Sequence, residues 1–112
     1  MSPITTHILD TALGNPAGGV GVRLEVSVDG GWHLVGEGKT DSDGRNKALM
    51  EAGTLKPATY RISFDTSGYY TALGQKSFYP EVRICFVVEN TDQHYHVPLL
   101  LSPFGYSTYR GS

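Results

Sequence analysis

Three histidines and one arginine are the side chains of this chain best suited to proton transfer and anion binding. His94 and His96 share the parity of one expected strand, so both should lie on the same face of it. His7 lies in an earlier expected strand whose face also carries Thr5, and Arg45 directly follows a turn glycine. A histidine can act as general acid or base near neutral pH, and an arginine presents a planar set of donors to an anion. Spacing alone favours the simpler interpretation, with surface or structural histidines and a solvated arginine.

The other familiar chemical motifs are absent or incomplete. The three histidines could bind zinc, but the chain has no paired cysteines and no compact ligand motif, so we expect neither a metal nor a cofactor. The segment 41–44 begins like a calcium loop and lacks the closing glutamate. Cys85 is the only cysteine, which excludes an internal disulfide, and its place between Ile84 and Phe86 predicts a packing role.

Apolar residues at every second position dominate the chain and predict β-strands. The segment 82–88 is apolar at both parities, which predicts burial on each face. Asp29-Gly30-Gly31 should close a hairpin between the strands on either side of it. Pro98 cannot donate to a ladder, so pairing should be interrupted there or the strand should lie at an edge. The expected strands are 4–11, 22–28, 32–39, 60–65, 82–88, 94–101 and 106–110.

Only the segment 66–74 is typical of a helix, with Thr66 or Ser67 as its cap and Gly74 at its end. Seven or eight short strands with one short helix predict an all-β sandwich. A sandwich of this size leaves edge strands open, and an open edge can pair with a second copy of the chain. The sequence therefore favours an oligomer.

Length and composition restrict the function further. The 112 residues suffice for one domain, 1–112, and 39% hydrophobic with 18% charged residues indicate a globular chain. A net charge of −2 argues against nucleic acid as a partner, and no apolar run is long enough for a membrane span. The first residues do not form a signal peptide, so we expect a cytoplasmic protein, with the peroxisome as the alternative in a eukaryote.

Five segments spread over nearly the whole chain carry family-specific motifs: 6–10, 43–45, 77–80, 94–103 and 106–112. Together they resemble the transthyretin-like family of the 5-hydroxyisourate hydrolase type. The terminal Tyr-Arg-Gly-Ser is the most specific of them, because transthyretin itself, a thyroid-hormone carrier, shares the fold and lacks this tail and the histidines.

This resemblance implies a fold, an assembly and a reaction. The fold would be a transthyretin-like sandwich of two four-stranded sheets with one short helix, assembled as a homotetramer, a dimer of dimers with active sites where the dimers meet. The substrate would be 5-hydroxyisourate, a small molecule hydrolysed without a cofactor during urate breakdown. The implied catalytic residues are His7, Arg45, His96 and Ser112, and the implied substrate-binding residues are His7, Arg45, Tyr109, Arg110 and Gly111.

The implied roles follow from the reaction. Hydrolysis of a strained cyclic amide needs an activated water, a stabilised oxyanion and a proton for the leaving nitrogen. His7 and His96 would share the proton transfers, Arg45 would hold the anionic purine and the oxyanion, and the tail would close the pocket. Two other classes stay open: a carrier of a small aromatic ligand in the channel between dimers, and a structural homo-oligomer with incidental histidines.

Overall fold

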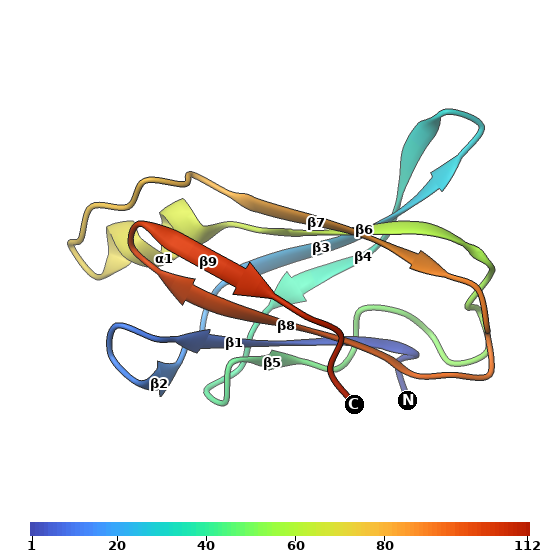
Figure 1. Cartoon of the computed structure of the whole chain (residues 1–112), viewed down its shortest axis with the longest axis horizontal. Coiled ribbons are helices and arrows are strands. Elements are labelled where there is room, and N and C mark those ends of the chain that lie inside the picture. Colours follow the sequence, from blue (N-terminus) through green and yellow to red (C-terminus); the bar gives the residue numbers. More distant parts are fainter.

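The computed structural model describes residues 1–112, which form two β-sheets packed face to face with one short helix at one end (Figure 1). The first sheet has the order β2-β1-β8-β9 with β5 also paired to β1, and the second has the order β4-β3-β6-β7. The sandwich with one short helix is thus confirmed, with sheets of five and four strands. The elements are β1 (Ile4–Asp10), β2 (Asn15–Pro16), β3 (Gly21–Val28), β4 (Gly31–Lys39), β5 (Arg45–Asn46), β6 (Ala58–Phe64), α1 (Thr66–Ala72), β7 (Val82–Val88), β8 (Tyr95–Ser102) and β9 (Gly105–Thr108).

Alternate residues of the long strands form the core between the sheets. Ile8 and Leu99 from the first sheet and Leu24 and Ile62 from the second have no exposed surface. Each such side chain contributes about 1.5–3 kcal/mol when it is removed from water. The period-two pattern therefore predicted the inward faces correctly, and it leaves the opposite face of the first sheet available for polar residues.

The β3–β4 hairpin has the predicted turn. Val28 pairs with Gly31, so Asp29 and Gly30 form a two-residue loop, with φ values of 51° and 80°. Positive φ at both central positions is the requirement of the hairpin turn that Asp-Gly favours. In Figure 1 the tip of this hairpin projects away from the rest of the sandwich.

The helix begins at Thr66, the first residue of the expected segment, but its cap lies one residue earlier than expected. Asp65, rather than Thr66 or Ser67, caps α1, because its carboxylate accepts a hydrogen bond from the Gly68 amide at 3.0 Å. Gly74 follows the helix with φ of +68°, which agrees with its predicted role in ending it.

The expectation of burial on both faces of 82–88 was wrong. β7 is the edge strand of its sheet, and in this chain no layer covers the sheet's outward face. Val82, Ile84 and Val88 point into the core, whereas Cys85 is exposed and Val87 has 60% of its surface exposed. Cys85 is therefore not a core packing residue of the single chain.

A parallel pairing between the first strand and the last long strand determines which distant residues meet. β1 runs parallel to β8 over seven residue pairs, from Ile4 opposite Tyr95 to Asp10 opposite Leu101. On its other side β8 pairs with β9 only as far as Leu99 opposite Thr108, so the ladder stops next to Pro98. This is the interruption that the proline predicted.

Candidate active site

The outward face of the first sheet gathers the histidines and the arginine. The β1–β8 register places Thr5 opposite His96, and the β1–β5 register places His7 opposite Arg45. Because residues of one parity share a face, the four side chains lie on the side of the sheet that faces away from the core. The structure thus brings three of the predicted catalytic residues together.

The imidazole rings form a stacked row with His96 in the middle. The ring centroids of His7 and His96 are 6.5 Å apart with an interplanar angle of 24°, and those of His94 and His96 are 6.5 Å apart with an angle of 21°. His94 precedes β8 and is exposed, whereas His96 is half-buried. The expectation that His94 and His96 face the same way is confirmed.

Burial and positive charge keep the two half-buried histidines, His7 and His96, unprotonated. Desolvation is the larger cause and the Arg45 guanidinium the second, and both lower the pKa of His7 and of His96 below 6.5. The pKa of His96 is lowered further by His7 and His94. Both rings are therefore neutral at pH 7, which is the form that can accept a proton from water.

A polar cavity of about 480 Å³ lies beside this row of rings. Only one of its lining residues is hydrophobic, and Lys47 adds a second positive charge to that of Arg45. Figure 1 shows the two chain termini close together at this part of the molecule. The cavity is lined by Met1, Thr5, Thr6, Arg45, Lys47, His94, His96 and Ser112.

The C-terminal tail reaches the cavity through its last residue, and the residue before it packs against His96. The Gly111 amide donates a hydrogen bond to the His96 carbonyl at 2.8 Å, and Ser112 lines the cavity. A Cβ at position 111 would lie 2.6 Å from Cδ2 of His96 and 3.2 Å from Cγ of Pro98. Only glycine fits there without moving the imidazole, which gives a physical reason for the Gly in the tail motif.

Two other residues of the predicted tail point elsewhere in the single chain. The Arg110 guanidinium lies 4.5 Å from the centre of the Tyr95 ring and donates a hydrogen bond to Oε1 of Gln93 at 2.9 Å. Tyr109 has 57% of its surface exposed and borders a groove between the edges of the two sheets. Substrate contact by Tyr109 and Arg110 stays a prediction.

Thr5 is the residue of this face to which the sequence assigned no role. Its Oγ1 lies 2.9 Å from Nε2 of His94 and 2.8 Å from Nδ1 of His96. The only sequence signal was its shared parity with His7, which became informative once the parallel pairing with β8 was known.

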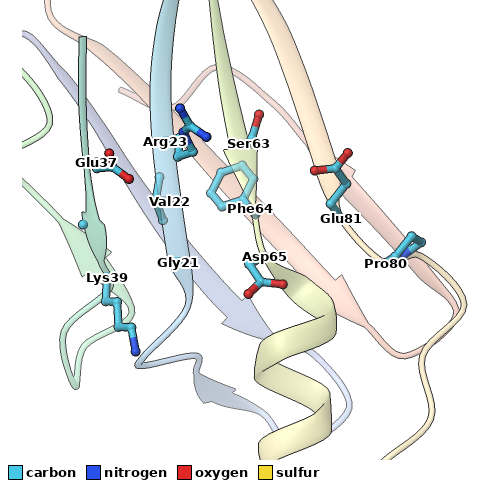
Figure 2. A pocket seen from close by; sticks show the side chains of 11 residues that line it. Gly21, Val22, Arg23, Glu37, Lys39, Ser63, Phe64, Asp65, Pro80 and Glu81 are labelled. Atoms are coloured by element: carbon cyan, nitrogen blue, oxygen red, sulfur yellow. The ribbon is translucent and has the colours of Figure 1, made fainter. Parts of the chain in front are cut away.

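A second, larger hollow lies on the outward face of the other sheet (Figure 2). It measures about 630 Å³, and Arg23, Glu37 and Ser63 stand side by side in it on three neighbouring strands. This hollow has no histidine, and its basic side chains lie next to acidic ones. None of the predicted site residues lines it, so we place the candidate active site at the histidine row.

The histidine row lacks the geometry of a metal centre. No three His, Cys, Asp or Glu side chains of the chain are grouped so that they could hold a metal ion. The chemistry available at this face is that of neutral imidazoles, a guanidinium and hydroxyl groups. No helix of the structure is long and apolar enough to cross a membrane.

Comparison with known proteins places the chain in a family. The sequence model of the HIUase/Transthyretin family matches residues 4–111. The chain belongs to this family. The 5-hydroxyisourate hydrolase of Salmonella dublin, a curated relative, is 48% identical to it over 109 residues, which cover 97% of this chain and 80% of the relative. The family expected from the sequence motifs is confirmed.

Solved structures of this family include both of its functional types. The 5-hydroxyisourate hydrolase of Klebsiella pneumoniae matches with a TM-score of 0.83 and 36% identity, covering 97% of this chain and 98% of that one. Sea bream transthyretin in complex with thyroxine matches with a TM-score of 0.92 and 34% identity, covering 97% and 94%. Backbone similarity therefore does not separate hydrolase from carrier, and the side chains on the β1–β8 face must do so.

Proposed function

We propose that this chain hydrolyses 5-hydroxyisourate to 2-oxo-4-hydroxy-4-carboxy-5-ureidoimidazoline, a step of urate degradation. The observation that carries the proposal is the convergence of His7, Arg45 and His96 on one polar face, beside a cavity that Ser112 lines. A relative with the hydrolase name is 48% identical over almost the whole chain.

The two neutral histidines share the acid–base work of the reaction. One imidazole takes a proton from water as the water attacks the ring carbonyl, and the imidazolium so formed returns this proton to the leaving nitrogen as the carbon–nitrogen bond breaks. His96 suits the first role because its ring lies in the middle of the row and its pKa is lowered by burial, by Arg45 and by the two neighbouring imidazoles. His7 lies beside Arg45, and its neutral ring orients the leaving group while the His96 imidazolium protonates the leaving nitrogen.

Arg45 stabilises the negative charge that develops at the attacked carbonyl. Arg45 is a half-buried residue opposite His7, where partial exclusion of water strengthens its attraction for an oxyanion. Ser112 adds a hydroxyl to the same cavity, and Gly111 fixes the end of the tail against the backbone of His96. Each of these groups is already positioned before substrate binds, which lowers the cost of reaching the transition state.

The active unit of this proposal is a homotetramer, a dimer of dimers. β7 and β9 are the edge strands on one side of the two sheets, and their backbone groups are free to pair with a second copy. Exposed aromatic and aliphatic side chains lie along or near the same edges, including Phe78, Val87 and Tyr106. Docking of a second dimer over the histidine face would close the open cavity into a cleft.

A ligand carrier is the second candidate, because the match to thyroxine-bound transthyretin has the higher TM-score. A carrier of an apolar aromatic molecule needs a largely hydrophobic site. The cavity at the histidine face has one hydrophobic residue among its eight, which favours a polar substrate.

The decisive experiment follows the decay of freshly generated 5-hydroxyisourate by ultraviolet absorbance. The His96→Ala and Arg45→Ala variants should lower turnover by at least ~10²-fold, the scale of one lost acid–base or oxyanion group. Matched controls are His33→Ala and Arg83→Ala, since both side chains are exposed and outside the site. Sedimentation should give a tetramer for every variant. Decay at the spontaneous rate in tetrameric wild-type protein would reject the hydrolase and leave the carrier.

A further inference from the structure

The hydroxyl group of Thr5 connects two of the three stacked histidines. It lies within hydrogen-bond distance of both Nε2 of His94, at 2.9 Å, and Nδ1 of His96, at 2.8 Å. The side chain is not free to swing away, because Thr5 has only 8% of its surface exposed and lies opposite His96 in the parallel pairing of β1 and β8. The hydroxyl is therefore a fixed part of the site.

The number of protons limits how this bridge can be made. A threonine hydroxyl has one proton to donate, so it can donate to one imidazole nitrogen and must accept from the other. The backbone carbonyl of Thr5, which can only accept, also lies close enough to the His96 ring to act on its pKa. An acceptor near the ring stabilises an N–H on it, and the nitrogen from which the Thr5 hydroxyl can accept such a proton is Nδ1. The Thr5 hydroxyl then accepts from His96 and donates to Nε2 of His94.

The consequence concerns the other nitrogen of the His96 ring. Desolvation and the Arg45 charge lower the pKa of this ring, so at pH 7 it carries a single proton. If that proton is on Nδ1, then Nε2 has a free lone pair. A general base needs that lone pair to take a proton from water, and a neutral ring in the other tautomer offers only an N–H at Nε2.

We propose that Thr5 is a positioning residue that, together with His94, holds His96 in the tautomer with a bare Nε2, the form that activates water. This inference rests on the proposed hydrolase function for its effect on turnover. The tautomer itself is a property of the resting protein and can be measured whether or not the chain turns over 5-hydroxyisourate.

The test compares Thr5→Val, which keeps the shape and removes the hydroxyl, with Thr5→Ser, which keeps the hydroxyl. Thr59→Val, a strand threonine of the other sheet, is the matched control. We expect Thr5→Val to lower kcat by about 10-fold or more with a smaller change in KM, a part of what a general base contributes. Thr5→Ser should restore most of kcat, and Thr59→Val should match wild type.

The second readout is the nitrogen-15 NMR spectrum of His96, which distinguishes the two neutral tautomers. Wild type and Thr5→Ser should show the proton on Nδ1, whereas Thr5→Val and His94→Ala should shift the population towards a proton on Nε2. A folded Thr5→Val protein with an unchanged tautomer, or a wild-type ring protonated on Nε2, would overturn the proposal. If wild-type protein shows the expected tautomers but does not hydrolyse 5-hydroxyisourate, the proposed function is rejected and the positioning role of Thr5 stands.

Discussion

Substitution of Gly111 by alanine tests whether close packing of the tail holds His96 in place. The added Cβ would lie 2.6 Å from Cδ2 of the His96 ring, and ordinary contact begins at about 3.4 Å, so the ring or the tail must move by about 0.8 Å. The ring cannot bend out of the way as a flexible side chain can. If the tail moves instead, the hydrogen bond from the Gly111 amide to the His96 carbonyl is lost.

Either movement should reduce catalysis at least as much as stability. A displacement near 1 Å in a catalytic group can cost about 10²-fold in rate, so a shift of about 0.8 Å should lower kcat by at least ~10-fold. A tenfold loss corresponds to about 1.4 kcal/mol of transition-state stabilisation. The lost hydrogen bond lowers the free energy of unfolding by about 0.5–1.5 kcal/mol. Kinetics of 5-hydroxyisourate decay and denaturant unfolding measure the two quantities separately.

The matched control is Gly105→Ala, in the strand that leads into the tail. A Cβ there would meet only Oγ of Ser102 at 3.7 Å, which is ordinary contact. This variant should retain wild-type kcat. A Gly111→Ala protein with wild-type kcat would refute the reasoning, because it would show that the position of His96 does not depend on this contact.

Two further predictions concern pH and buried hydroxyl groups. Burial and Arg45 lower the pKa of His7 and His96 in the folded protein, so the unfolded chain binds protons at a higher pH than the folded chain does. The contribution of these two histidines to the free energy of unfolding should be full above pH 6.5 and should be lost as pH falls through the lower folded pKa values. The value of kcat/KM should fall over the same range. Denaturant unfolding and rate profiles between pH 5 and 8 test this. A protein whose stability falls only as pH rises above 7 would contradict it. Tyr69→Phe removes a 2.7 Å hydrogen bond to a buried carboxylate of β1 and should cost about 1–3 kcal/mol in unfolding free energy. Tyr70→Phe removes a buried hydroxyl without a partner and should leave stability unchanged or higher, so a comparable loss in both variants would show that Tyr70 is paired after all.

Local rules account for the elements that the sequence predicted well. The alternation in 22–28 and 60–65, the Asp29-Gly30 turn and the glycine after the helix each depend on residues within a few positions of one another. The error at 82–88 has a different origin, since an apolar strand at an edge has the same sequence pattern as a strand buried on both sides. Burial depends on what packs against a strand, which its own residues do not encode.

In the candidate site, too, local sequence identified the residues but not the way they come together. The residues themselves, with the family resemblance, indicated His7, Arg45, His96 and the tail. Their meeting on one face depends on the parallel pairing of β1 with β8, two segments about 90 positions apart in the chain. No local pattern specifies which distant strands pair or in which register.

The sequence by itself determined the strand faces, the turns and the set of side chains able to transfer protons, because these follow from residue type and short-range periodicity. Only the tertiary structure decided that Thr5 bridges His94 and His96, that Gly111 packs against the imidazole, and that Arg110 lies over Tyr95 instead of in the cavity. Each of these contacts depends on ångström-scale distances between segments brought together by strand pairing. The physical reason is that side-chain chemistry is a property of one residue, whereas a site is a property of the register that places several residues together.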